Sequence, residues 1–242
     1  MKALNTTTLT MQALCFFIVL IVTMHGIHAV DYNVTISVKS SSTPGGARFR
    51  DQIGVEYARQ KLDSATQFIW GLFQQTNNPA DRRNVQKVSL IVVVETAGDV
   101  PANTNVNDNI IHLSAKYVNS YTGDLKNEIT GILYHETTHV WQWFGNNQAP
   151  VGLTEGIADY VRLKANYIPG HWVKPGQGDK WDHGYDVTAR FLEYCDSLRN
   201  GFVADLNKKL RNGYNDQYFV ELLGKTPGQL FTEYKAKYGN IA

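Results

Sequence analysis

The residues best suited to chemistry in this sequence are two histidines four positions apart, with a glutamate between them. The segment His135-Glu136-Thr137-Thr138-His139 has the pattern HExxH. On a helix, residues at i and i+4 lie on one face, so both imidazoles can reach a single metal ion. Glu136 lies about 100° round the helix, where it can contact a water molecule on that ion without being a ligand. Neutral imidazole nitrogens suit zinc, and such a glutamate can take a proton from the attacking water.

A catalytic zinc site needs a third protein ligand. A third histidine in the pattern HExxHxxGxxH is excluded, because Gln142 and Gly145 stand where glycine and histidine would be required. The preferred third ligand is Glu155, which opens a predicted helix after a loop. Asp159 lies one turn further along the same face and can accept the second ring proton of a zinc-bound histidine. The exchanged arrangement, with Asp159 as the ligand and Glu155 structural, is the main alternative.

The elements that must position these residues begin with strands. Strict alternation of apolar and polar residues over 32–38 predicts a half-buried strand, and the apolar run over 88–94 predicts a central strand. The asparagine-rich segment 103–109 is expected to be a loop. Ile110–Leu113 is a short strand candidate. It could be an edge strand that pairs with an extended substrate, with ordinary sheet structure as the alternative.

Helical patterns follow a turn-rich break over 40–46. An amphipathic helix is expected over 49–73, because apolar residues recur near a single face. Further helices are expected over 125–144, 154–167, 184–199, 202–211, 215–223 and 227–238. The last of these opens with Thr226-Pro227, an N-cap followed by proline at the first helical position. An order of strands first and helices after them is typical of an α+β domain.

Three further residues are candidates for the site. Peptide hydrolysis needs a group that stabilises the negative charge on the carbonyl oxygen, opposite the general base. Tyr185 is the first choice, with His183 second, because the block 183–185 lies at the start of a predicted helix and after a long loop. A packed tyrosine with a satisfied hydroxyl is the alternative for Tyr185. Arg162 could form an ion pair at the site, but we interpret it as part of a solvated helix face.

The N-terminus has the features of a secretory signal peptide over residues 1–29. Lys2 precedes the uncharged apolar run 13–22, which is too short for a membrane span, and the segment closes on Ala29. Residues 30–242 are then expected to form a single domain. Without Lys2 the formal charge falls from +1 to 0, so nucleic acid and anionic membranes are not expected as partners. Cys195 is the one cysteine after residue 29 and is interpreted as a buried apolar residue.

Three blocks in order resemble the plant basic secretory protein family of pathogenesis-related, peptidase-like proteins: HETTHVWQW (135–143), EGIADYVRLKA (155–165) and GYDVTARFLEYC (184–195). The resemblance covers essentially the whole chain after the signal peptide. It implies a zincin-like peptidase domain over 30–242, secretion to the apoplast and a role in plant defence. The chain differs from the family's name in being near neutral rather than basic.

Residues and resemblance together predict a secreted zinc-dependent endopeptidase that acts on protein or peptide substrates. Zn²⁺ is the expected cofactor, held by His135, His139 and Glu155, with Glu136 as general base. The alternative is a non-catalytic secreted defence protein that keeps a zinc site or binds a pathogen ligand. The intact Glu136 favours the enzyme, because a purely structural zinc site needs no general base.

Overall fold

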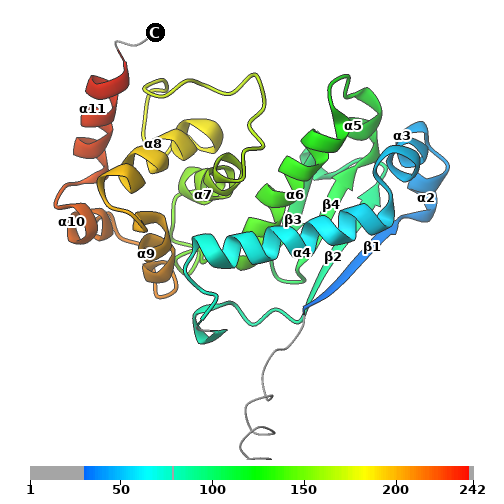
Figure 1. Cartoon of the computed structure of the whole chain (residues 1–242), viewed down its shortest axis with the longest axis horizontal. Coiled ribbons are helices and arrows are strands. Elements are labelled where there is room, and N and C mark those ends of the chain that lie inside the picture. The colour runs from blue at the N-terminus through cyan, green and yellow to red at the C-terminus, as the bar shows by residue number, and fades with distance from the viewer. Residues whose placement is uncertain (1–29, 78, 240–242) are drawn as a thin grey trace, which may run out of the picture. The chain divides into compact units, whose positions relative to one another are not determined.

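The computed structural model describes residues 30–77 and 79–239, and its sheet lies in the N-terminal half (Figure 1). Four strands form this sheet in the order β1-β2-β4-β3. Their bounds are Asp31–Ile36 (β1), Lys87–Val93 (β2), Ala102–Asn105 (β3) and Ile110–Ser114 (β4). The pairs β1–β2 and β2–β4 are parallel, whereas β3–β4 is antiparallel. The predicted central strand is confirmed in β2, where Val88, Leu90 and Val92 are fully buried.

The Ile110–Leu113 strand is present, but its possible edge position is wrong and the alternative of ordinary sheet structure is confirmed. Ile110–Leu113 is not an edge strand, because β4 lies between β2 and β3. The edge is β3, which occupies the start of the segment 103–109 that was expected to be a loop. Asparagine is disfavoured in strands, so composition pointed to a loop. An edge strand with part-exposed side chains tolerates it, since only Ala102 of β3 is buried.

The helix expected over 49–73 is divided by one glycine. Gly54 has a φ of 82°, a left-handed conformation that ends one helix and permits the next to start. Before it lie α2 (Val38–Ser41), α3 (Pro44–Arg48) and a π-helical turn (Phe49–Ile53); after it comes α4 (Val55–Leu72). The break expected over 40–46 is therefore largely helical. Thr43, which lies in this segment, caps α3: its side-chain hydroxyl accepts a hydrogen bond from the backbone N–H of Gly46.

The helical half follows the predicted pattern closely. Its helices are α6 (Leu125–Trp141), α7 (Val151–Lys164), α8 (Tyr185–Leu198), α9 (Phe202–Lys209), α10 (Gln217–Leu223) and α11 (Pro227–Tyr238). Thr226 caps α11 with a capping box, and Pro227 occupies its first turn as predicted. One short helix, α5 (Ala115–Ser120), was not expected. Short 3-10 turns lie at Pro79–Asp81 and Ala97–Asp99.

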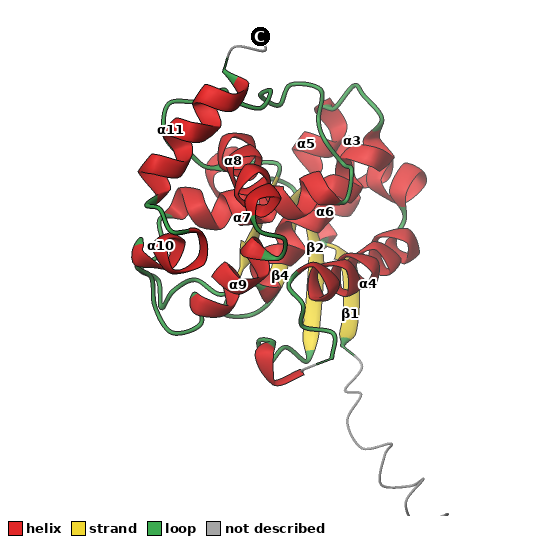
Figure 2. Cartoon of the chain, turned by 60° about the vertical axis from the view of Figure 1, so that its left-hand side comes forward, coloured by secondary structure: helices red, strands yellow, loops and turns green. Residues whose placement is uncertain are grey.

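The α6 helix joins the two halves. On one side it packs against α4 and strand β3, and on the other against α7. Beyond α7 lies α8, which packs against α9 and α11, while α10 packs against α9. These helices form a layer on the side away from the strands in Figure 1, and Figure 2 brings this layer forward. Phe191, Phe219 and Tyr234 are fully buried in that layer. A mixed α+β architecture is thus confirmed, with a sheet first and helices after it.

The described residues from Asp31 onward belong to one compact unit. None of the helices described is long and apolar enough to cross a membrane. The signal peptide expected over residues 1–29 lies outside the described residues. Cys195 is buried, and burial raises the pKa of its thiol well above the usual value, in keeping with an inert apolar role.

Candidate metal centre

The HExxH segment lies in a part of α6 that is buried all round. Asp124 caps the helix by accepting from the backbone N–H of Asn127, and every residue from Glu128 to Trp141 is buried. Ordinary packing explains the apolar members of this run. It does not explain two histidines and a glutamate, because polar groups in a dry interior require partners.

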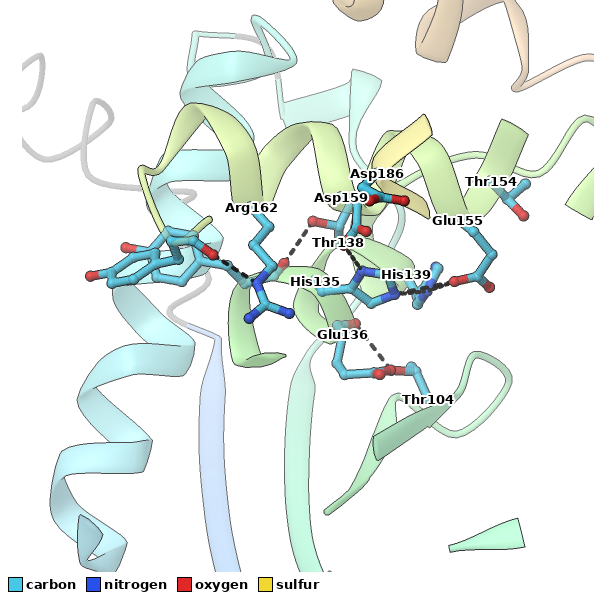
Figure 3. A network of polar contacts seen from close by, with 12 residues as sticks. Thr104, His135, Glu136, Thr138, His139, Thr154, Glu155, Asp159, Arg162 and Asp186 are labelled. Carbon is cyan, nitrogen blue, oxygen red and sulfur yellow. Dashed lines mark hydrogen bonds and ion pairs between the residues drawn. The ribbon is translucent and has the colours of Figure 1, made fainter. Parts of the chain in front are cut away.

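Three side chains from α6 and α7 converge on one point (Figure 3). The Nε2 atoms of His135 and His139 are 3.1 Å apart. Glu155, in the first turns of α7, places Oε2 3.2 Å from His135 Nε2 and 3.5 Å from His139 Nε2. Two ligands of one tetrahedral zinc ion are separated by about 3–4 Å. We call these three residues the His-His-Glu group; its donor atoms have the spacing of a metal site.

Asp159 lies behind His135. Its Oδ1 is 2.6 Å from His135 Nδ1, so Nε2 is the nitrogen that faces the group's centre. Burial lowers the pKa of His135, but the carboxylates of Asp159, Glu155 and Glu136 raise it more, to about 10. Burial raises the pKa of Glu155, yet its contacts with both histidines hold that pKa far below its usual value. The group therefore favours positive charge at its centre.

These observations fit a divalent metal ion. Two imidazole nitrogens and one carboxylate oxygen are a donor set that first-row transition metals accept, zinc among them. A cation at the centre would take the place that a proton on His135 otherwise fills. The carboxylate behind His135 would then hold that ring in the tautomer that ligates through Nε2.

Glu136 points away from the His-His-Glu group toward the sheet (Figure 3). Its Oε2 accepts a hydrogen bond of 2.6 Å from the hydroxyl of Thr104, on the edge strand β3. The same hydroxyl lies 3.1 Å from the backbone carbonyl of Glu136. Sequence reasoning missed Thr104, because the segment was expected to be a loop and the contact joins residues 32 positions apart.

A cavity of about 610 Å³ opens beside these residues. Its walls include strand β3, the His-His-Glu group, Phe144 and Trp172. Tyr185 also lines it, with its ring stacked on His135 at 6.1 Å between centroids and 11° between planes. Burial and the nearby carboxylates of Glu155 and Asp159 raise the pKa of Tyr185, so its hydroxyl stays protonated.

Tyr185 has a φ of 46°, an unusual value for a tyrosine, and the residue remains 54% exposed. Non-glycine residues in this region cost about 1–3 kcal/mol and cluster at functional sites. His183, the second candidate, is exposed and is not among the residues that line the cavity. The structure thus places Tyr185 beside His135 in the cavity wall and leaves His183 outside that wall.

The interpretation of Arg162 as part of a solvated face is wrong. Arg162 is buried, and its Nη2 donates to Glu128 Oε2 at 2.8 Å, while Nε donates to the carbonyl of Tyr167 at 2.9 Å. Its guanidinium lies against α6 at Gly131, where a β-carbon would come within 2.6 Å of Nε. The pattern of α7 gave no sign of this partner, because Glu128 is 34 residues away. Both residues are among those that line the cavity.

The sequence is similar to known peptidases. The sequence profile of the BSP family, described as "Peptidase of plants and bacteria", matches residues 31–234. A "Basic secretory protease" from Boswellia serrata is 48% identical over 60 residues, which are 25% of this chain and 69% of that protein. No solved structure matches the chain at a significant level.

Proposed function

The chain belongs to the BSP family, the peptidases of plants and bacteria, and on this premise we propose that it is a zinc-dependent endopeptidase of zincin-like architecture. The observation that carries the proposal is the convergence of His135 Nε2, His139 Nε2 and Glu155 Oε2 within hydrogen-bonding distance in the wall of a cavity. As a peptidase it would act on protein substrates.

His135, His139 and Glu155 would hold the zinc ion. When bound, the ion would polarise the substrate carbonyl and lower the pKa of a bound water molecule. Glu136 would accept a proton from the attacking water and pass it to the leaving amine. Thr104 orients the Glu136 carboxylate through its 2.6 Å hydrogen bond. Tyr185, stacked on His135 at the mouth of the cavity, would donate its phenolic hydrogen to the developing oxyanion.

The substrate would bind along β3. This strand pairs only with β4 among the described strands, so its other edge offers backbone N–H and C=O groups to an extended peptide. Thr104 of the same strand contacts Glu136, which places the bound backbone next to the proposed base. The cavity would then receive a substrate side chain, with the Glu128–Arg162 pair in its wall.

We also propose that residues 1–29 are a signal peptide, that the protein is exported to the apoplast and that it serves in plant defence. The support is the N-terminal sequence pattern, together with the name of the relative, which describes a secretory protease. N-terminal sequencing of protein collected from the medium of expressing plant cells tests export. A first residue before position 25, or complete retention in the cells, would refute this part.

The test of catalysis compares wild type with Glu136→Gln and Tyr185→Phe on an unstructured protein such as casein, with metal analysis of each. Glu136→Gln keeps the size of the side chain but removes the base, so turnover should fall by about 10²–10⁴-fold with metal content unchanged. Tyr185→Phe keeps the ring and should lower turnover by about 10²-fold.

Unchanged turnover in Glu136→Gln would refute the mechanism. A wild type that binds metal but cleaves nothing in a broad peptide library would favour a non-catalytic defence protein.

A further inference from the structure

Gln142 stands where α6 ends. Its backbone N–H still donates to the carbonyl of Thr138, at 2.8 Å, but its ψ of 157° turns the chain out of the helix. Its side chain is fully buried and turns back to His139. In the sequence this residue counted only as a departure from the glycine of the longer histidine pattern.

The amide of Gln142 links both helices of the His-His-Glu group. Its Nε2 lies 2.9 Å from His139 Nδ1 and 3.3 Å from the carbonyl of Thr154, the residue before Glu155. The amide oxygen is buried and has no hydrogen-bond partner among the described residues. A buried amide that leaves its one acceptor atom unused is uncommon, because the lost hydrogen bond costs free energy.

Metal binding changes the hydrogen bond that His139 Nδ1 needs from the amide of Gln142. The Nε2 of His139 faces His135 and Glu155, so it is the nitrogen that would ligate an ion. A neutral imidazole carries one proton, which must then sit on Nδ1. An N–H at Nδ1 needs an acceptor, and an amide nitrogen cannot accept. Half a turn of the amide about its last bond replaces that nitrogen with the oxygen that has no partner.

We propose that Gln142 is a positioning residue for the metal ligand His139, and that its amide oxygen accepts the Nδ1 proton of His139 when the ion is bound. This inference rests on the metal site proposed above. The two histidines then have different hydrogen-bond partners. The carboxylate of Asp159 can only accept a hydrogen bond from His135, whereas the amide of Gln142 can accept one from His139 or donate one to it. The amide therefore serves His139 in the metal-free chain through Nε2 and in the metal-bound chain through Oε1.

Two variants separate an acceptor role from a merely structural one. Gln142→Met keeps the length of the side chain and removes both the acceptor and the donor. Gln142→Glu removes only the donor, so it loses any contact with the carbonyl of Thr154 but can still accept from Nδ1. Metal-free wild type and variants are titrated with Zn²⁺ against a chromophoric chelator, and thermal unfolding of the metal-free chains checks that each variant folds.

The proposal expects Gln142→Met to weaken Zn²⁺ binding by about 10–100-fold and Gln142→Glu to stay within about threefold of wild type. Nitrogen-15 spectra of the Zn²⁺-loaded wild type should show the His139 proton on Nδ1. Equal losses in both variants would overturn the proposal in favour of a structural donor. No loss in either variant would overturn it by showing that the amide does not support metal binding at all. A His139 proton found on Nε2 would overturn it by showing that Nε2 does not ligate the ion. If wild type itself takes up no Zn²⁺, both the metal site and this inference are wrong. If wild type binds Zn²⁺ but Gln142→Met and Gln142→Glu bind it equally well, only the role of Gln142 is wrong.

Discussion

The interface between α6 and α7 contains two polar clusters that differ in kind. One is the Glu128–Arg162 pair, and the other is the His-His-Glu group about two turns away on the same helices. Glu128, Arg162 and the two histidines are buried, and Glu155 is partly exposed. Both clusters pair a residue of α6 with one of α7. In the pair one positive charge meets one negative charge, and the Glu128 carboxylate accepts from Arg162 at one oxygen and from Tyr117 at the other.

The His-His-Glu group has acceptors in excess. Around its centre lie the carboxylate of Glu155 and the ligating nitrogens of two imidazoles, with Asp159 directly behind. Burial lowers the pKa of His135, but the carboxylates of Asp159, Glu155 and Glu136 raise it more, so these groups favour a positive charge here. Structural and functional polar clusters on one interface therefore differ in whether their hydrogen bonds are complete. A balanced pair completes its own hydrogen bonds, whereas a cluster of acceptors requires an ion or a proton from solution.

The largest effect is expected from breaking the balanced pair. Arg162→Met leaves Glu128 charged, buried and without its cation, so the free energy of unfolding should fall by about 3–5 kcal/mol. The double variant Glu128→Gln/Arg162→Met removes both charges while keeping an acceptor for Tyr117, and it should recover most of the loss. Urea unfolding of both variants measures this. A cost below about 1 kcal/mol for the single variant would mean that the pair is screened like a surface ion pair.

Removing the metal should lower stability by a smaller amount, and only in chains whose His-His-Glu group is intact. An ion that binds only the folded chain stabilises it by about 2.7 kcal/mol at a concentration of 100 times its Kd. A chelator should therefore lower the Tm of wild type and of Arg162→Met, but leave that of His135→Ala unchanged. Differential scanning calorimetry with and without chelator measures the shift. Equal chelator sensitivity in His135→Ala would place the stabilising ion elsewhere.

The smallest effect tests how the edge strand serves the site. Thr104→Val keeps the shape of the side chain but removes the hydroxyl that holds the Glu136 carboxylate. Turnover should fall by about tenfold, at the low end of what a hydrogen bond to a charged group contributes, with zinc content unaltered. Thr104→Ser keeps the hydroxyl and is the matched control. Steady-state kinetics with Thr104→Ser as slow as Thr104→Val would point to packing of the methyl group instead.

Local spacing explains what the sequence determined by itself. Positions four apart share a helix face whatever the rest of the fold does, so His135 and His139 were predictable as a pair, and so were Glu155 and Asp159. The amphipathic patterns of the C-terminal half likewise located its helices to within a few residues, since each buries one stripe against its neighbours. The order of strands and helices was enough for the α+β class.

The tertiary structure alone decided which of these faces meet. Packing of α7 on α6 brings Glu155 to the histidines, joins Arg162 to Glu128 across 34 positions and sets the amide of Gln142 between His139 and Thr154. Antiparallel pairing of β3 with β4 carries Thr104 to Glu136. No spacing along the chain encodes such contacts, because they depend on how whole elements pack. Helix geometry acts within a few residues, whereas burial is settled only when distant elements meet.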